Sequence, residues 1–286
     1  MESIFHDGLF AGQTIVVSGG GTGIGRAVAG ELARLGATVV LCSRGMQHLE
    51  PARDAILAAG GQAEALTCNV RDPESVEAFF REAVARHGRI DGLVNNAGGQ
   101  FISHAEAISP KGWHAVVETN LTGAFLMARA AFNSGMGQHG GSIVNIVMEM
   151  WQGFPGMAHS GAARAAVVNL TRTLAREWGQ FGVRVNAVAP GLIDTEGMRN
   201  YGPETLAHLH AVAHEIPAGR MGTTHEIAAP IVFLLSPGAA FVSGATLRVD
   251  GGGETPYRFR EGATREPWPQ YTALAGDGGG DEGSAE

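Results

Sequence analysis

A glycine-rich turn close to the amino terminus constrains the fold more than any other feature of the chain. It reads Ser18-Gly19-Gly20-Gly21-Thr22-Gly23-Ile24-Gly25 and lies between an apolar run, Thr14–Ser18, and a helical pattern, Arg26–Leu35. Glycine lets the backbone turn tightly and approach a pyrophosphate group, whose charge is met by the amino terminus of the helix. A strand, this turn and a helix in this order therefore predict a dinucleotide-binding edge of a parallel sheet.

The rest of the chain alternates short apolar runs with longer helical patterns, which is typical of α/β proteins with helices on both faces of a parallel sheet. Several runs are almost continuous in β-branched residues, as expected of strands that are covered on both faces. We therefore expect one doubly wound, Rossmann-type α/β domain with a seven-stranded parallel sheet. The expected strands are Thr14–Ser18, Thr38–Cys42, Ala63–Asn69, Gly92–Asn95, Ser142–Val147, Val183–Val188 and Thr246–Val249.

Capping patterns mark the starts of three further helices. Asp72-Pro73 opens a helix that runs towards His87, and Ser109-Pro110 opens one that passes through Trp113 and Leu126. Thr223-Thr224-His225-Glu226 has the spacing of a capping box ahead of Ile227–Leu235.

The domain is expected to span residues 1–254, followed by a carboxyl-terminal tail over 255–286. Segment 192–222 is a long excursion between a strand and a helix, which is where mobile substrate lids are found. In the tail, Gly276–Glu286 is rich in glycine and acids and is expected to be disordered. Trp268 and Tyr271 indicate that the part before it docks onto the domain.

Composition excludes several classes of function. The chain has 286 residues and a net charge of -8, and it contains no run of basic residues that would bind nucleic acid. No stretch approaches the ~18 consecutive apolar residues of a membrane span, and the first residues lack the regions of a signal peptide. Cys42 and Cys68 are expected to be reduced core residues without a metal. We therefore expect a cytoplasmic protein.

The end of the second strand indicates which dinucleotide is bound. Folds that prefer NAD commonly place an acid there to hold the ribose 2′-hydroxyl group, whereas this chain reads Cys42-Ser43-Arg44. A hydroxyl and a guanidinium suit a 2′-phosphate through charge-assisted hydrogen bonds. The pattern favours NADP(H), the alternative being that Arg44 is a solvated surface residue.

Taken together, these motifs resemble the short-chain dehydrogenase/reductase family from about Gly12 to Gly252. The spacing Gly19-x3-Gly23-x-Gly25, the turn Asn95-Asn96-Ala97-Gly98 and Pro190-Gly191 each match a cofactor-binding motif of that family. The resemblance implies a cofactor site made of Gly19, Thr22, Gly23, Ile24, Gly25, Ser43, Arg44, Asn69, Val70, Asn96, Ala97, Gly98, Arg164, Pro190, Gly191 and Ile193.

The catalytic motif departs from the family pattern. Where the family has Tyr-x-x-x-Lys, the chain reads Ser160-Gly161-Ala162-Ala163-Arg164, and the family serine falls on Val147 or Met148. Asn120 matches the family asparagine, which bends its helix and holds a water of the proton relay.

No displaced group can replace the missing ones locally. Lys111 is the only lysine, and the tyrosines are Tyr201, Tyr257 and Tyr271, all far beyond the motif. The chain has therefore lost the acid–base group of ordinary alcohol–ketone chemistry.

Other segments resemble the trans-2-enoyl-CoA reductases of peroxisomes, within the group that also holds the 2,4-dienoyl-CoA reductases. This resemblance implies NADPH-dependent reduction of an acyl-CoA thioester and an assembly of four copies, packed through the helix of Trp113 and the helix Ala162–Trp178. The segments are Gly98–Phe101, Lys111–His114, Gly141–Ile146, Gly153–Pro155, His159–Ala165 and Trp268-Pro269.

Reduction of an enoyl thioester fits the residues that remain. Hydride addition to the β-carbon places negative charge on the thioester oxygen as an enolate, which needs hydrogen-bond donors and positive charge. Ser160 can donate a hydrogen bond, and Arg164 lies one helical turn later on the same face, although arginine is a poor proton shuttle because its pKa exceeds ~12.

Several points stay open in the sequence. Tyr201 in the lid is the first candidate for the donor of the α-proton, and a water near Asn120 is the second. Arg199, Arg220 and Arg258 are candidates for contacts with the CoA phosphates. The alternatives are a 2,4-dienoyl-CoA or carbonyl reductase of the same family, or a non-catalytic NADP-binding module.

Overall fold

A computed structural model describes residues 3–253 and 267–271, apart from the side chains of residues 199 and 200. Seven strands form one parallel sheet in the order β3-β2-β1-β4-β5-β6-β7. This confirms the predicted doubly wound, Rossmann-type architecture. The strands are β1 (Thr14–Ser18), β2 (Thr38–Ser43), β3 (Gln62–Thr67), β4 (Gly92–Asn95), β5 (Gly141–Ile146), β6 (Val183–Pro190) and β7 (Thr246–Val249).

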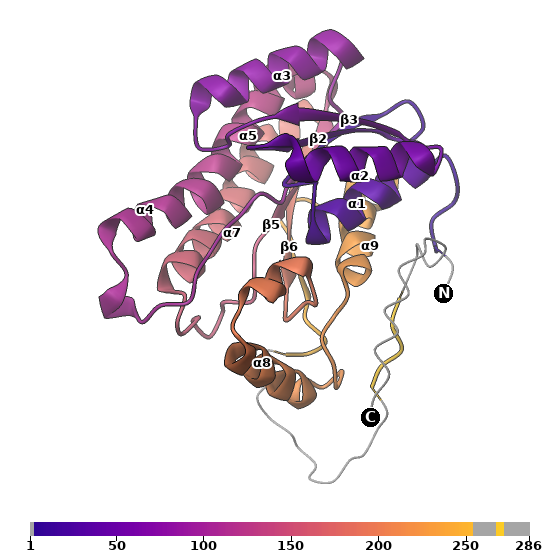
Figure 1. Ribbon diagram of the computed structural model, residues 1–286. Coiled ribbons are helices and arrows are strands. Elements are labelled where there is room, and N and C mark those ends of the chain that lie inside the picture. Colours follow the sequence, from indigo (N-terminus) through magenta and orange to yellow (C-terminus); the bar gives the residue numbers. More distant parts are fainter. Residues whose placement is uncertain (1–2, 254–266, 272–286) are drawn as a thin grey trace.

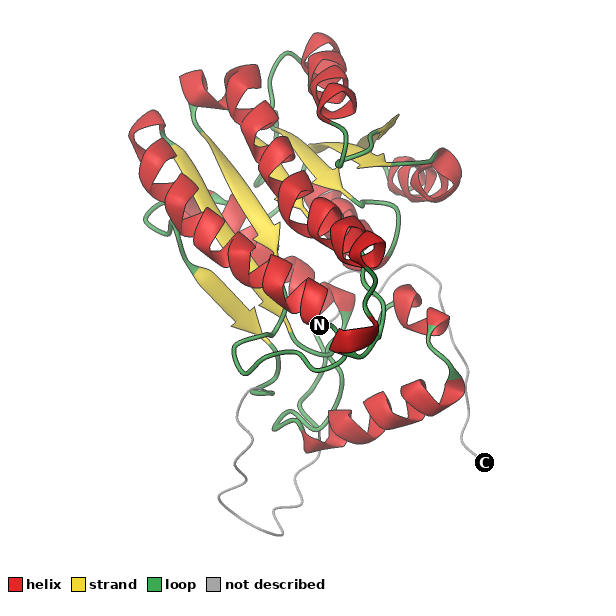
Figure 2. Ribbon diagram, turned by 90° about the vertical axis from the view of Figure 1, so that its left-hand side faces the viewer, coloured by secondary structure: helices red, strands yellow, loops and turns green. Residues whose placement is uncertain are grey.

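Helices cover both faces of the sheet (Figures 1 and 2). One face packs against α1 (Gly23–Arg34), α2 (Met46–Ala58) and α9 (Thr224–Leu235). The other packs against α3 (Pro73–His87), α5 (Gly123–Ala131) and α7 (Ala158–Trp178), with α4 (Pro110–Val117) beside α7. The inner strands β1, β2, β4, β5 and β6 are buried between the two helical layers, whereas the edge strands β3 and β7 are partly exposed.

The capping predictions are confirmed. The Asp72 side chain accepts a hydrogen bond from the Glu74 amide at the start of α3, and Ser109 does the same for Gly112 at the start of α4. Thr223 and Glu226 form the reciprocal pair of a capping box at α9.

Some boundaries differ from expectation. The third strand ends at Thr67 rather than Asn69, because the Asn69 carbonyl accepts a hydrogen bond from the Asp72 amide and closes a turn. The sixth strand continues to Pro190, because this residue still pairs with Val249 of β7.

The helix expected through Trp113 and Leu126 is interrupted by a π-helical turn, Glu118–Thr122, between α4 and α5. A π-helical turn inserts one extra residue into the helix and is often found at functional sites. Asn120 lies in this turn and is completely buried, so the helix is irregular at the residue where the family resemblance implied a bend.

A buried polar ladder fixes α7 against the sheet. The Asn95 amide donates to Asn145 Oδ1 at 2.9 Å, and the Asn145 amide donates to Thr171 Oγ1 at 2.9 Å. Thr171 donates in turn to the Val167 carbonyl one helical turn earlier, at 2.8 Å. These three bonds connect β4, β5 and α7 through buried side chains, so this ladder sets the position of α7, which carries Ser160 and Arg164.

The segment predicted as a lid stands at the carboxyl end of the strands. It contains a short 3-10 turn, Glu196–Asn200, and α8 (Pro203–Glu215), which lies apart from the two helical layers (Figure 1). The expected disordered stretch Gly276–Glu286 lies outside the described residues, as do Tyr257 and Arg258.

Candidate functional site

The glycine-rich turn packs against the residue that follows β4. Gly19 has a φ of +65°, and a Cβ atom on Gly25 would lie 2.2 Å from the Gly19 carbonyl oxygen and 2.5 Å from Asn96 Nδ2. The Asn96 amide donates to the carbonyls of Ser18 and Gly19 at 3.1 and 3.0 Å. Glycine is therefore required at both positions, and the asparagine holds the turn in shape.

The amino terminus of α1 is open to an anion. Thr22 precedes the helix without making a side-chain capping bond, and the first turn contains no acidic residue. The first N–H groups of a helix have no partner within it, and the helix dipole favours negative charge there. The lid passes close by, because Thr195 lies 3.7 Å from the position of a Cβ on Gly23 and Glu196 forms an ion pair with Arg26 at 2.5 Å.

The ends of β2 and β3 place the expected adenosine contacts side by side. Ser43 donates to the Gly45 carbonyl at 2.8 Å, and Arg44 is exposed without an ion pair to any described residue. Asn69 follows β3 next to Val70, whose side chain is buried against Gly123. Ser43 and Arg44 thus lie at the edge where a ribose 2′-substituent is bound in such folds.

The turn after β6 is held by β7. The Gly191 amide donates to the Val249 carbonyl at 3.0 Å, and a Cβ on Gly191 would lie 2.8 Å from Asp250 Cα. Ile193 is buried and forms an isolated parallel bridge with Gly222. Pro190, Gly191 and Ile193 therefore form one fixed segment at the carboxyl edge of the sheet.

Asn120 connects this edge to α7. Its amide oxygen accepts from the Gly99 amide at 2.9 Å, and its Nδ2 donates to the Gly99 carbonyl at 3.0 Å. Nδ2 also lies 3.4 Å from Ser160 Oγ. The structure thus brings Asn120 and Ser160 into direct contact, with the segment after β4 held against them.

Ser160 is completely buried, and sequence reasoning missed its main partner. Its hydroxyl donates to Gln100 Oε1 at 2.9 Å and lies 3.5 Å from Met148 Sδ. Met148 is one of the two residues on which the family serine falls, and its sulfur is a weak acceptor that cannot donate a hydrogen bond. In the sequence, the only indication of this partner is that Gln100 is a polar residue within the Gly98–Phe101 segment, which resembles the enoyl-CoA reductases.

Arg164 is a buried cation, not a surface residue. It is 8% exposed, and burial lowers the pKa of its guanidinium to about 10. Nη1 donates to the Ile146 carbonyl at 2.5 Å, and a Cβ on Gly98 would lie 2.2 Å from Nη2. A guanidinium has five N–H donors, and no carboxylate among the described residues pairs with this one.

These features fit a bound dinucleotide. The glycine turn leaves backbone N–H groups for phosphate, the missing Cβ of Gly98 makes room for the Arg164 guanidinium, and the remaining guanidinium donors suit ribose hydroxyl groups. The residues expected at the cofactor site lie at or after the ends of β1, β2, β3, β4 and β6 and on α1 and α7.

Tyr201 belongs to a separate apolar cluster within the lid. It packs with Leu192, Leu206 and Leu209 against buried Met198 and Met221. The cluster ties α8 to the two ends of the lid, so Tyr201 has a packing role there whatever its chemical role.

Arg220 is engaged at the base of the lid and is not free for a CoA phosphate in this arrangement. Its guanidinium binds both carboxylate oxygens of Glu226, and it donates to the carbonyls of Trp268 at 2.6 Å and Pro269 at 3.0 Å. The predicted docking of the tail is thus observed at Trp268 and Tyr271, whose amide donates to Glu226.

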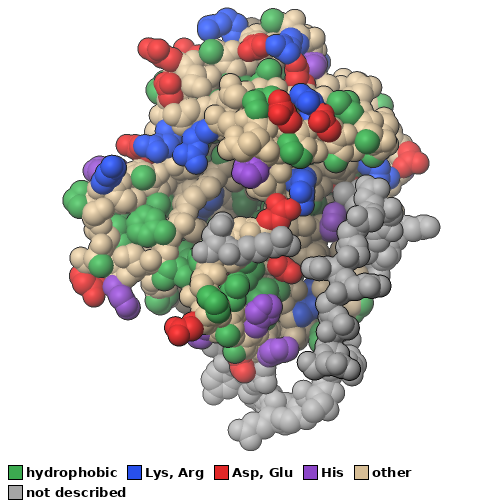
Figure 3. Space-filling view, in the orientation of Figure 1, with side chains coloured by type: hydrophobic (Ala, Val, Ile, Leu, Met, Phe, Trp, Pro, Cys, Tyr) green, Lys and Arg blue, Asp and Glu red, His purple; other side chains and the backbone are tan. Residues whose placement is uncertain are grey.

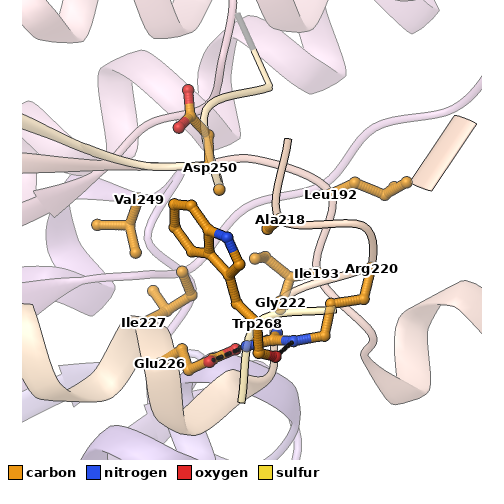
Figure 4. A pocket seen from close by; sticks show the side chains of 11 residues that line it. Leu192, Ile193, Ala218, Arg220, Gly222, Glu226, Ile227, Val249, Asp250 and Trp268 are labelled. Atoms are coloured by element: carbon orange, nitrogen blue, oxygen red, sulfur yellow. Dashed lines mark hydrogen bonds and ion pairs between the residues drawn. The ribbon is translucent and has the colours of Figure 1, made fainter. Parts of the chain in front are cut away.

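Next to this contact lies a small cavity of about 190 Å³. Trp268 projects into it between Val249 and Ala218, and the ion pair of Arg220 with Glu226 closes its lower side (Figure 4). The docked tail therefore forms part of the wall behind the lid.

Two further polar groups lie near the site. Burial raises the pKa of the Glu149 carboxyl, and the neighbouring Asp250 carboxylate raises it further, while the Trp151 amide and the Arg248 guanidinium act in the opposite direction. His159 is completely buried, packs edge-on against Phe101 and accepts a hydrogen bond from the Ser160 amide.

Within the described residues, no group of three His, Cys, Asp or Glu side chains is placed to hold a metal ion. Over the same part of the chain, no helix combines the length and the hydropathy needed to cross a membrane. Charged side chains of both signs are mixed over the face seen in Figure 3.

The fold and the cofactor edge define a dinucleotide-dependent oxidoreductase. The family model described as enoyl-(acyl carrier protein) reductase matches residues 13–254. The chain therefore belongs to the short-chain dehydrogenase/reductase family, whose members use nicotinamide cofactors.

Known proteins of this family are similar over almost their whole length. The probable 2,4-dienoyl-CoA reductase of Bacillus subtilis is 38% identical over 251 residues, which cover 86% of this chain and 99% of the relative. The 3-oxoacyl-[acyl-carrier-protein] reductase of Vibrio cholerae is 35% identical over 242 residues, covering 84% and 97%. The solved citronellol catabolism dehydrogenase of Pseudomonas aeruginosa PAO1 is 50% identical, covers 88% and 99%, and superposes with a TM-score of 0.80.

Proposed function

We propose that the protein is an NADPH-dependent reductase of the trans-2 double bond of acyl-CoA thioesters. The observation that carries the proposal is the buried Ser160, with Met148 Sδ 3.5 Å from its hydroxyl, on the same helix as a buried Arg164 that forms an ion pair with no described carboxylate. This site offers hydrogen bonds and fixed positive charge, and it offers no tyrosine–lysine pair for protonating a ketone.

NADPH supplies the hydride to the β-carbon when it is bound. Arg164 then holds the nicotinamide ribose and contributes positive charge, which lowers the energy of the enolate on the thioester oxygen. Asn120 holds the Gly98–Phe101 segment in place and orients the Ser160 hydroxyl through its Nδ2. The hydrogen bonds of the site thus act on charge that develops during the reaction, not on the resting substrate.

Preference for NADP(H) over NAD(H) is part of the same proposal. It rests on the exposed Arg44 beside Ser43 and on the absence of an acidic side chain at the end of β2. A guanidinium there can bind a 2′-phosphate with charge-assisted hydrogen bonds.

The source of the α-proton remains Tyr201 or a water near Asn120, as the sequence predicts. The packing of Tyr201 inside the lid cluster makes its arrival at the site dependent on lid closure. Proton delivery from a lid residue would couple protonation to the exclusion of bulk water.

A 2,4-dienoyl-CoA reductase is the second candidate, favoured by the similarity to the B. subtilis relative. Reduction of a conjugated dienoyl thioester also passes through an enolate, so the same residues would serve it. Dehydrogenation of an alcohol such as citronellol needs a base to remove the hydroxyl proton, and neither Ser160 nor Arg164 is suited to that step.

We also propose a homotetramer in the cytoplasm. Trp113 on α4 and Phe125 on α5 are large apolar side chains that are 38% exposed, and α7 presents Ala162 and Ala165 beside them. Such faces permit close helix packing between copies, which sedimentation of the purified protein will test. Free buried Cys42 and Cys68 are compatible with a reducing compartment.

The test is NADPH oxidation with trans-2-enoyl-CoA, 2,4-dienoyl-CoA and 3-ketoacyl-CoA thioesters, run beside citronellol with NADP+. We expect turnover of the enoyl thioester. Turnover of the dienoyl thioester alone would establish the second candidate, and turnover of the ketoacyl thioester or of citronellol alone would contradict the reasoning from the missing tyrosine. Cofactor binding without turnover of any substrate would indicate a non-catalytic module.

A further inference from the structure

The hydroxyl group of Ser160 is enclosed by protein atoms. Its side chain has no exposed surface, and its oxygen lies 2.9 Å from Gln100 Oε1, 3.4 Å from Asn120 Nδ2 and 3.5 Å from Met148 Sδ. A substrate oxygen in the cleft therefore meets another group before it meets Ser160.

The direction of the hydrogen bonds at Ser160 is determined by its neighbours. Asn120 Nδ2 can only donate, so the serine oxygen accepts there and its proton points elsewhere. A thioether sulfur is a weak acceptor and an amide oxygen a strong one, so the proton goes to Gln100 Oε1 rather than to Met148. This hydrogen bond also fixes which end of the Gln100 amide faces the protein.

Gln100 lies on the solvent side of that contact. The residue is exposed, and the segment around it is fixed on both sides. Asn120 binds both backbone groups of Gly99, and Phe101 packs edge-on against His159 with ring centroids 4.4 Å apart. Because Oε1 is turned towards Ser160, the two N–H donors of Nε2 lie at the exposed end of the side chain, and no described residue accepts from them.

We propose that Gln100 is the residue that donates a hydrogen bond to the thioester oxygen, and that Ser160 is a positioning residue acting through it. This inference rests on the proposed function, and it assigns the contact with the substrate oxygen to Gln100 instead of Ser160. The relay runs from Asn120 to Ser160 to Gln100, and each member fixes the orientation of the next. Hydrogen bonds in such a chain polarise one another, which strengthens the Nε2 donors as charge develops on the substrate oxygen.

Variants at the two positions separate this arrangement from direct contact by Ser160. We expect Gln100→Ala to lower kcat by about 10²-fold, the usual effect of removing one oxyanion donor. Gln100→Glu keeps the shape but removes the donors and adds like charge, so it is expected to lose more. Gln180→Ala, at an exposed glutamine in the turn between α7 and β6, is the matched control and should leave kcat unchanged.

The decisive measurement is a double-mutant cycle with Ser160→Ala. If Ser160 acts only through Gln100, adding Ser160→Ala to Gln100→Ala lowers kcat by less than threefold, whereas Ser160→Ala alone costs tenfold or more. KM for NADPH should stay within twofold throughout, because neither residue belongs to the proposed cofactor site. Multiplicative losses in the double variant, or full activity in Gln100→Glu, would overturn the inference.

The activity of the wild-type protein distinguishes a failure of the inference about Gln100 from a failure of the proposed function. If it reduces none of the thioesters, the proposed function fails. The affinity of hexanoyl-CoA for the complex with NADP+ then tests Gln100 without turnover. Weaker binding to Gln100→Ala than to wild type would support the contact, and equal affinity would refute it.

Discussion

Replacing Arg164 by methionine should change apo stability and cofactor binding in opposite directions. The guanidinium is buried with one backbone acceptor, and burial lowers its pKa to about 10. Relative to an arginine in water, this corresponds to about 3 kcal/mol of free energy, at ~1.4 kcal/mol for each tenfold change in the ionisation constant. The pKa of Arg164 is lower in the folded protein than in the unfolded chain, so the buried charge destabilises the fold at neutral pH. This destabilisation disappears only as pH rises through the pKa of the folded state towards that of the unfolded state.

Methionine keeps an unbranched apolar stem and removes the charge. The variant loses the hydrogen bond to the Ile146 carbonyl, which is worth ~1.5–3 kcal/mol for a charged donor. The net effect on the apo protein is therefore a gain of ~0–1.5 kcal/mol, or up to about 6 °C in Tm for a chain of this size. The stabilisation that saturating NADPH gives should fall sharply, because the ribose contacts of the guanidinium are gone.

Arg184 is the matched control for this substitution. It is also partly buried with a lowered pKa, but it donates to the carbonyls of Leu234, Leu235 and Ser236 at the end of α9. Arg184→Met should therefore lower apo Tm and leave the NADPH response unchanged.

Thermal unfolding of the three proteins, with and without NADPH, measures both quantities. A loss of more than about 1 kcal/mol in the apo Arg164→Met protein, or an undiminished response to NADPH, would refute the assignment of Arg164 as a charge held for the cofactor.

Three other substitutions follow from the same structure. Gly98→Ala should weaken NADPH binding at least tenfold by titration, because its Cβ would lie 2.2 Å from a guanidinium that the Ile146 carbonyl holds in place; unchanged affinity would mean that the guanidinium moves freely. Burial raises the pKa of the Glu149 carboxyl, so its ionisation destabilises the fold as pH rises through that pKa. Glu149→Gln should accordingly be more stable than wild type at about pH 8 and not at about pH 4, and a Tm difference independent of pH would contradict this. Arg220→Gln removes the contacts that tie the lid base to the tail, so limited proteolysis of the lid should accelerate while the NADPH-induced rise in Tm is kept.

Local patterns were sufficient for the architecture and for the positions of the site residues. The glycine turn, the alternation of apolar runs with helical patterns and the capping pairs each depend on neighbours along the chain. They predicted the seven parallel strands, the start of α3 and the capping box of α9. The spacing of Ser160 and Arg164 likewise placed them on one helical face.

What surrounds these residues was decided by the tertiary structure. Gln100 and Ser160 are 60 residues apart, and they meet only because β4 and β5 are neighbours and a buried amide ladder fixes α7 against them. The burial of Arg164 depends in the same way on the strand end at Ile146 and on Gly98. Burial and hydrogen-bond partners set the pKa of a group and the direction of its proton, and both depend on contacts between distant segments that no local pattern contains. The sequence by itself determined that this chain binds a dinucleotide at the edge of a parallel sheet, and only the folded arrangement determined that Ser160 lies behind Gln100 and that Arg164 is a buried cation.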